Sequence, residues 1–189
     1  MLQIKAVVWD IGGVLLTDPQ YKDFWKNIDG SKKLRELFGS GKISVLEFVK
    51  QASPLLGLSE EKFLEKYKEA YCVINKNEGA CNVYSLMKIP KYILSDTNPI
   101  HLEHLHKSFP EIFESSKGTF ASPEIGIRKS NPLAYKFIIE KIGFSPNEIL
   151  LIDNKQEVLD LAAKEGIRTL LFENCKKLKK DLSDFGVDF

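Results

Sequence analysis

The stretch IKAVVWDIGGV, residues 4–14, decides the fold. Its apolar run at residues 4–9 predicts a buried strand that ends at Asp10. Gly12 and Gly13 follow directly and let the backbone close around an incoming group. Because a carboxylate is costly to bury without a partner, we expect Asp10 to face a ligand. The simpler alternative for this stretch alone is a turn in which Asp10 caps a helix.

Length and charge exclude several classes of partner. The chain has 189 residues, enough for one α/β core with a small accessory element or for two small domains. Its formal net charge is only +1, which gives no field for nucleic acid or an anionic membrane to recognise. We therefore expect no nucleic-acid or membrane partner, and local groups must hold any anionic ligand. Protein partners are not indicated by the sequence.

The cysteines and the amino-terminal stretch bear on the compartment. Cys72, Cys81 and Cys175 have no metal-ligand spacing, and an odd number argues against a disulfide framework. The apolar stretch at residues 6–16 is too short to span a bilayer and lacks the features of an export signal. A reducing cytoplasm is the expected location.

Strand-like and helix-like segments alternate along the chain. Strands are predicted at residues 4–9, 92–94, 149–152 and 168–172, and helix starts at Asn98-Pro99 and Asn131-Pro132. This alternation predicts an α/β fold, with a doubly wound parallel sheet covered on both faces. Residues 18–87 show no strand signal, and helix starts are expected at Asp18-Pro19, Ser44 and Ser59. We therefore expect a core of residues 1–17 and 88–189, with a helical insertion at 18–87.

The residues that end the predicted strands should converge, because doubly wound sheets bind ligands at the carboxyl ends of their strands. These residues are Asp10, Ser95 and Asp153, and Lys129 lies in a loop between two helices. Together they match the needs of phosphoryl transfer. Asp10 would attack phosphorus, Ser95 would hold phosphate oxygens, and Lys129 would neutralise charge, with a magnesium ion bridging Asp10 and the phosphate.

Four short motifs, in order, resemble those of the haloacid dehalogenase (HAD) superfamily, whose members are mostly phosphate-ester hydrolases. They are DIGGVL at residues 10–15, ILSDTN at 93–98, GIRK at 126–129 and LIDN at 151–154. The resemblance covers nearly the whole chain. It implies a Rossmann-like core, a helical cap inserted after the first motif, an aspartyl-phosphate intermediate, and substrate binding by Ser95, Asp96 and Lys129.

Within the superfamily, the chain is most similar to small bacterial sugar-phosphate phosphatases. This similarity is carried by SDTN at residues 95–98 with His101, by the Arg128-Lys129 pair, and by GKIS at residues 41–44. It implies a magnesium-dependent phosphatase of a small phosphorylated metabolite. The expected magnesium ligands are Asp10, the main-chain carbonyl of Gly12, and Asp153 or Asn154.

Three positions depart from the motifs of the superfamily. Gly12 stands where an aspartate usually acts as general acid and base, a loss that costs roughly 10²–10⁴ in rate. Asn154 replaces the second acid of the fourth motif, which should weaken magnesium binding because an amide carries no charge. Ser130 and Asn131 replace the usual proline and acid, which should change loop geometry more than chemistry.

Two other functions remain open. One is a metal-free 2-haloacid dehalogenase of the same superfamily, in which the second aspartate of the first motif is also absent; Asp153 and the second motif argue against it. The other is a degenerate, non-catalytic domain that binds a phosphorylated ligand or a protein partner, which Gly12, Asn154 and Ser130 together favour. A zinc site on the histidines at 101, 104 and 106 is disfavoured, because no acid or cysteine completes a tetrahedral set.

Overall fold

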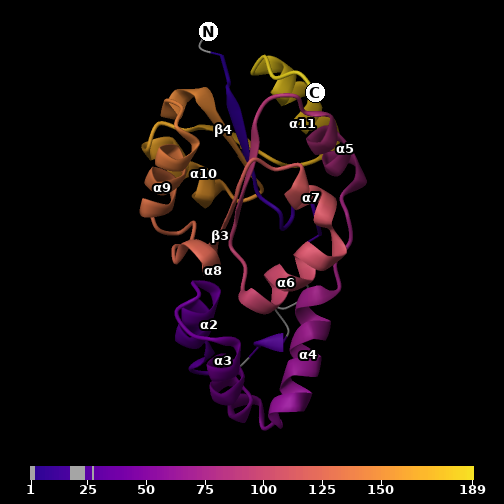
Figure 1. The fold of residues 1–189 in the computed structure, drawn as a ribbon, viewed down its shortest axis with the longest axis vertical. Coiled ribbons are helices and arrows are strands. Elements are labelled where there is room, and N and C mark those ends of the chain that lie inside the picture. Colours follow the sequence, from indigo (N-terminus) through magenta and orange to yellow (C-terminus); the bar gives the residue numbers. More distant parts are fainter. Residues whose placement is uncertain (1–2, 18–23, 27) are drawn as a thin grey trace.

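The computed structural model describes residues 3–17, 24–26 and 28–189. Its centre is a five-stranded, fully parallel sheet in the order β3-β2-β1-β4-β5 (Figure 1). The strands are β1 (Ala6–Trp9), β2 (Lys91–Ser95), β3 (Thr119–Ala121), β4 (Ile149–Asp153) and β5 (Arg168–Leu171). The predicted doubly wound α/β fold is confirmed, and β1 lies in the middle of the sheet with Val8 opposite Leu151.

The two faces of the sheet are buried by different helices, because successive side chains of a strand point to opposite faces. Trp9 packs in the cluster that contains Tyr84 and Leu178, whereas Val8 packs in the cluster that contains Ile138 and Leu159. The first face is covered by α5 (Glu78–Leu86), α6 (Pro99–Ser108), α7 (Pro110–Glu114) and α11 (Cys175–Asp184). The second is covered by α9 (Leu133–Ile142) and α10 (Gln156–Lys164). Burial on both faces explains the nearly continuous apolar runs of β1 and β4.

Strand β3 was not predicted from the sequence. It has only three residues, Thr119–Ala121, and lies at the edge of the sheet beside β2. A run of this length is below what apolar periodicity can identify. Its position matters because the short helix α8 (Ser122–Ile125) follows at once and carries Ser122 to the junction with the cap.

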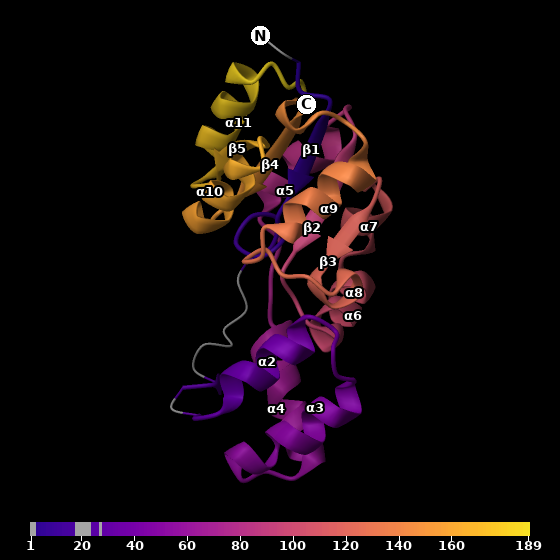
Figure 2. The same cartoon turned by 90° about the vertical axis from the view of Figure 1, so that its left-hand side faces the viewer.

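The inserted helices form a separate lobe below the sheet, which we call the cap (Figure 2). Its helices are α2 (Ser31–Gly39), α3 (Val45–Ala52) and α4 (Glu60–Cys72), with a 3-10 turn, η1 (Pro54–Leu56). The Ser44–Glu47 capping box of α3 and the Ser59 cap of α4 are both present, as expected. An aromatic cluster fills the cap, in which Phe38 stacks on Phe48 at 3.9 Å between ring centroids. The start expected at Asp18-Pro19 lies outside the described residues.

Helix α5 corrects the expected extent of the cap. Its residues Ala80, Val83 and Tyr84 pack in the core cluster around Trp9, and the helix contacts α11. Apolar periodicity identifies a helix but not the surface that it covers, so the sequence assigned α5 to the insertion. The expected cap of residues 18–87 is therefore corrected to one that ends near Cys72.

The cap is fastened to the core through Ser122. Its hydroxyl donates a hydrogen bond of 2.7 Å to the carbonyl of Gly39 in α2 and accepts one of 3.0 Å from the main-chain N–H of Thr97. Ile100 of α6 also packs in the aromatic cluster of the cap. A Cβ atom at Gly41 would lie 2.0 Å from the carbonyl oxygen of Pro123, so only glycine permits this approach of the two lobes.

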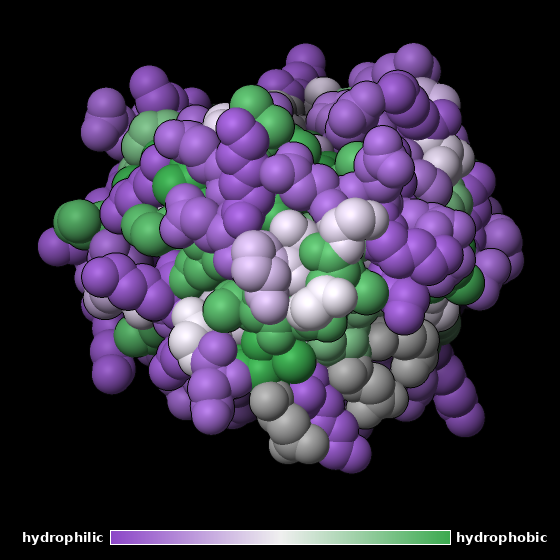
Figure 3. Space-filling model, turned by 90° about the horizontal axis from the view of Figure 1, so that it is seen from below, coloured by the Kyte–Doolittle hydropathy of each residue, from purple (hydrophilic) through white to green (hydrophobic). Residues whose placement is uncertain are grey.

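Among the described residues, no helix is both long and apolar enough to cross a bilayer. Seen from the cap end, hydrophobic side chains gather near the centre of the surface within a hydrophilic surround (Figure 3). The exposed large hydrophobic residues of the cap are Val45, Leu46 and Leu55. All three cysteines are free thiols.

Candidate active site

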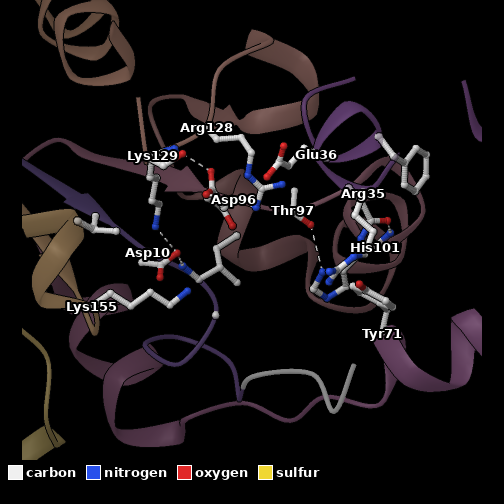
Figure 4. Close-up of a pocket in the computed structure, with 18 of the residues that line it drawn as sticks. Asp10, Arg35, Glu36, Tyr71, Asp96, Thr97, His101, Arg128, Lys129 and Lys155 are labelled. Atoms are coloured by element: carbon white, nitrogen blue, oxygen red, sulfur yellow. Dashed lines mark hydrogen bonds and ion pairs between the residues drawn. The ribbon is translucent and has the colours of Figure 1, made fainter. Parts of the chain in front are cut away.

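A cavity of about 520 Å³ lies between the carboxyl ends of the strands and the cap (Figure 4). Core residues from several segments line it: Asp10 and Gly12 after β1, Ser95 at the end of β2, and Lys129 from the loop between α8 and α9. The cap contributes its lining from α2 and α4. The sequence-predicted convergence of strand ends is thus present in the fold, because parallel strands place their carboxyl ends at one edge.

Asp10 is held in one orientation by its own strand end and by Lys129. Its main-chain N–H donates to the carbonyl of Ile152, and the carboxylate is only 4% exposed. Oδ1 accepts a hydrogen bond of 2.8 Å from the N–H of Ile11 and lies 2.6 Å from Nζ of Lys129. Within the described part of the chain, Oδ2 has no hydrogen bond or ion pair. Asp10 therefore has one anchored oxygen and one free oxygen.

Lys129 links two buried carboxylates. Its Nζ lies 2.6 Å from Oδ1 of Asp10 and 2.7 Å from Oδ2 of Asp153, and the lysine side chain is 4% exposed. The hydroxyl of Tyr135 donates a 2.7 Å hydrogen bond to the carbonyl of Lys129, which fixes the loop from below. The main-chain N–H of Lys129 donates a hydrogen bond of 2.9 Å to Oδ1 of Asp96.

The pKa values of this group follow from burial and from the shared charges. Burial raises the pKa of Asp10 to about 6, against the attraction of Lys129 and with added repulsion from Asp153. Burial by itself would lower the pKa of Lys129, but the two neighbouring carboxylates outweigh it and the pKa is raised. Lys129 is therefore an ammonium at neutral pH, and Asp10 is able to ionise there.

The side chains at the end of β4 offer oxygen ligands for a hard cation such as magnesium. Asp153 is fully buried, and its Oδ1 accepts a hydrogen bond of 2.9 Å from the N–H of Lys155. The side-chain Oδ1 of Asn154 is buried and has no hydrogen-bond partner among the described residues. An unpaired buried amide oxygen in the residue next to Asp153 is a fitting ligand for magnesium. Among the described residues no cluster of three histidine, cysteine or acidic side chains is present, so this candidate set depends on Asn154 and the Gly12 carbonyl.

Residues of the second motif have different environments. Ser95 is buried, lines the cavity and makes no side-chain hydrogen bond within the described residues. Asp96 was expected to bind substrate, but its oxygens already accept from the N–H of Lys129 and pair with Arg128 at 3.4 Å. These contacts give Asp96 a role in positioning the loop that carries Lys129. Substrate binding by Asp96 stays a prediction.

Several cavity residues were not predicted from the sequence. Lys155 lies two residues after Asp153, a spacing that could have identified it. Arg35, Glu36 and Tyr71 come from the cap and have no local signal, since only the docking of the cap brings them to the cavity (Figure 4). Of the three histidines, only His101 lines the cavity.

Comparisons with known proteins agree with this arrangement. A model of the haloacid dehalogenase-like hydrolase family matches residues 4–166. D-ribitol-5-phosphate phosphatase of Bacteroides thetaiotaomicron is 24% identical, in an alignment that covers 95% of this chain and 97% of that protein. Flavin mononucleotide hydrolase 1 of Arabidopsis thaliana is 36% identical over 37% of this chain, which spans 29% of that protein's length.

Solved structures share the fold. A HAD family enzyme of Bacteroides thetaiotaomicron, in complex with magnesium and inorganic phosphate, superposes with a TM-score of 0.73 at 22% identity, covering 90% of this chain and 95% of that one. A HAD-like hydrolase of Porphyromonas gingivalis gives 0.77 at 22% identity, covering both chains completely. L-2-haloacid dehalogenase of Xanthobacter autotrophicus gives 0.63 at 19% identity, covering 96% of this chain and 83% of that one. At such identities the likeness establishes the fold alone.

Proposed function

The chain belongs to the haloacid dehalogenase-like hydrolase family, and on that premise we propose that it is a magnesium-dependent phosphatase of small phosphorylated metabolites. The observation that carries the proposal is the carboxylate of Asp10, whose Oδ1 is anchored by Ile11 and Lys129 while Oδ2 is free. A nucleophile needs this combination of a fixed orientation and an unengaged lone pair.

In the first step, Oδ2 of Asp10 forms a bond to phosphorus as the bond from phosphorus to the leaving oxygen breaks. The product is an aspartyl phosphate, and the leaving oxygen departs with the bonding electron pair. The ammonium of Lys129 and the hydroxyl of Ser95, which both line the cavity, would interact with the phosphoryl oxygens. In the second step, water attacks phosphorus and the bond from phosphorus to Oδ2 breaks. Inorganic phosphate is released, and the carboxylate of Asp10 is regenerated.

Proton transfer to the leaving oxygen is the weak point of this site. Gly12 has no side chain to supply the proton, so the leaving oxygen must take it from solvent or depart as an anion. Esters with acidic leaving groups, such as aryl, acyl or sugar-anomeric phosphates, should therefore react faster than simple alkyl phosphates.

Magnesium fits the oxygen ligands that follow β1 and that lie at the end of β4. Asp10, the main-chain carbonyl of Gly12, and Asp153 or Asn154 would hold it, and when bound it would stabilise the negative charge of the phosphoryl group. The unpaired Oδ1 of Asn154 supports this assignment. The solved structure with magnesium and phosphate is of a chain with the same fold.

A small phosphate ester is the substrate class that fits best. The relatives named above hydrolyse D-ribitol 5-phosphate and flavin mononucleotide by their names, and both carry one phosphate on a hydroxylated chain. The cavity of about 520 Å³ has room for a ligand of the size of D-ribitol 5-phosphate. We propose a sugar phosphate or a closely related compound.

Hydrolysis of a panel of phosphate esters by the purified protein, with magnesium or with chelator, tests the proposal. Asp10→Asn should keep the fold and lower kcat by more than roughly 10³-fold, since the amide is not a nucleophile. Asp184→Asn, on the surface of α11, is the matched control and should keep full activity. Substantial turnover by Asp10→Asn would overturn the assignment of the nucleophile.

Two further assays separate the two other functions. Release of halide from 2-chloropropionate in chelator would identify a metal-free dehalogenase. Binding of phosphate or a phosphate ester without any turnover would identify a non-catalytic domain.

A further inference from the structure

Two residues at the cap end of the cavity each have a buried polar atom without a partner among the described residues: Nε2 of His101 and Nε of Arg35. Both residues line the cavity that holds Asp10. Figure 4 shows Arg35, His101 and Tyr71 grouped together, at the opposite side of the view from Asp10 and Lys129. Buried polar atoms nearly always have a hydrogen-bond partner. Two unpaired atoms on residues that line one cavity therefore indicate a place for a polar group of a ligand.

His101 is held rigidly for this role. It lies in the first turn of α6, is 9% exposed, and its main-chain N–H donates to Oδ1 of Asn98. Its Nδ1 lies 3.1 Å from the hydroxyl of Thr97. We assign the tautomer in which that hydroxyl donates to Nδ1, because the hydroxyl has no other acceptor among the described residues. A neutral imidazole that accepts at Nδ1 carries its proton on Nε2, which is then a donor.

The charge state of His101 favours binding over acid catalysis. Burial, together with His104, lowers the pKa of His101 to about 4. The imidazole is therefore neutral at neutral pH and has no surplus proton for a leaving group. It can donate a hydrogen bond from Nε2 without giving the proton away.

Arg35 supplies a second donor from the cap. Its guanidinium lies 5.4 Å from the ring centroid of Trp25, which holds the side chain over the aromatic cluster. In the described part of the chain no carboxylate lies within ion-pair distance of it. A guanidinium has donors only, so a ligand that satisfies Arg35 must offer an acceptor oxygen.

We propose that Arg35 and His101 form a second subsite that binds oxygen atoms of the leaving group, so that the enzyme selects phosphate esters of hydroxylated or carboxylated chains over apolar ones. The subsite rests on the proposed phosphatase function and adds a substrate class to it. Phosphate would bind at Asp10, and the oxygen-bearing tail would reach the cap. Hydroxyl and carboxylate oxygens share this acceptor chemistry.

Three esters of matched length separate the sources of that oxygen. Pentyl phosphate, ribitol 5-phosphate and ribonate 5-phosphate all have a primary alkyl leaving oxygen, and phenyl phosphate reports on the reaction at Asp10. For the wild type we expect kcat/KM to be at least roughly 10-fold higher for one oxygenated ester than for pentyl phosphate. Preference for ribonate identifies a carboxylate tail, and preference for ribitol a hydroxylated one.

Two variants test the residues. Arg35→Gln and His101→Phe should each reduce that preference by roughly 10-fold, mainly through KM. Lys33→Gln removes a cation from the exposed side of the same helix and should leave the preference intact. If phenyl phosphate is hydrolysed and neither variant changes the preference, or if Lys33→Gln lowers it equally, the subsite is wrong while the phosphatase function stands.

Binding provides a readout that does not depend on turnover. In protein carrying Asp10→Asn, calorimetry should find the preferred oxygenated ester bound roughly 10-fold more tightly than pentyl phosphate. Adding Arg35→Gln should remove this difference. Equal affinities before Arg35 is changed would overturn the subsite, whether or not the wild type is an active phosphatase.

Discussion

The ammonium of Lys129 lies 2.6 Å from Oδ1 of Asp10, and both side chains are almost completely buried. The same ammonium contacts Asp153, so two carboxylates at the centre of the site share a single ion-pair partner. This arrangement explains how Asp10 can be ionised in a buried place. It also makes the site depend on one lysine.

Lys129→Met should destabilise the protein as well as abolish activity. The variant leaves two buried carboxylates without a counter-ion, a change that costs about 3–5 kcal/mol in free energy of unfolding. The loss should be smaller near pH 4, because the raised pKa of Asp10 lets that carboxyl take up a proton. Urea unfolding at pH 7 and pH 4 measures both effects. The exposed Lys136→Met is the control, and an equal loss in both variants would contradict the role of Lys129.

Asn154→Asp should tighten magnesium binding. The unpaired Oδ1 of Asn154 becomes a charged oxygen, and the dissociation constant for magnesium should fall by roughly 10-fold. Calorimetric titration of the metal measures the change directly. Asn174→Asp, at the cap of α11, should leave magnesium binding as in the wild type. Unchanged or weaker binding by Asn154→Asp would place the metal elsewhere.

Gly12→Asp should restore a proton donor at the mouth of the site. Gly12 lines the cavity and does not have a positive φ, unlike Gly13 at 77°, so its backbone accepts a side chain. We expect kcat for alkyl phosphates to rise by roughly 10-fold or more, and kcat for phenyl phosphate to change little. Rates across leaving groups of graded acidity measure this. A wild-type enzyme that shows no dependence on leaving-group acidity would mean that another residue supplies the proton.

His101 should make the protein less stable in acid. Its folded pKa is about 4, whereas the unfolded chain takes up the proton near 6.5. Between these values the unfolded state binds more protons, so stability falls as pH falls, by about 3 kcal/mol in total. Unfolding free energies from pH 7 to pH 4 should show a shallower decline for His101→Phe. An imidazole that titrates near 6.5 in NMR spectra would contradict the lowered pKa.

The fold class, and the order in which the strand-end residues follow one another along the chain, could be predicted from the sequence. Residues 6–9 and 149–152 are apolar throughout because both faces of a parallel sheet are buried, and that pattern is local. The residues that end these strands, Asp10 and Asp153, meet because parallel strands share one carboxyl edge. Helix-capping motifs such as the Ser44–Glu47 capping box of α3 are also local in sequence, and the structure contains this one.

The packing of α5, the edge strand β3 and the cap residues that line the cavity depend on tertiary contacts. In the sequence, α5 resembles the amphipathic helices of the cap. Its packing against the core depends on α11, which is distant in the sequence. Strand β3 is too short to have a period, and it forms because β2 offers an edge. Arg35 reaches the cavity through the docking of the cap, which Ser122 and Gly39 fasten across 83 positions of sequence. Contacts between residues so far apart leave no local pattern, because their energy comes from surfaces that meet only in the folded chain.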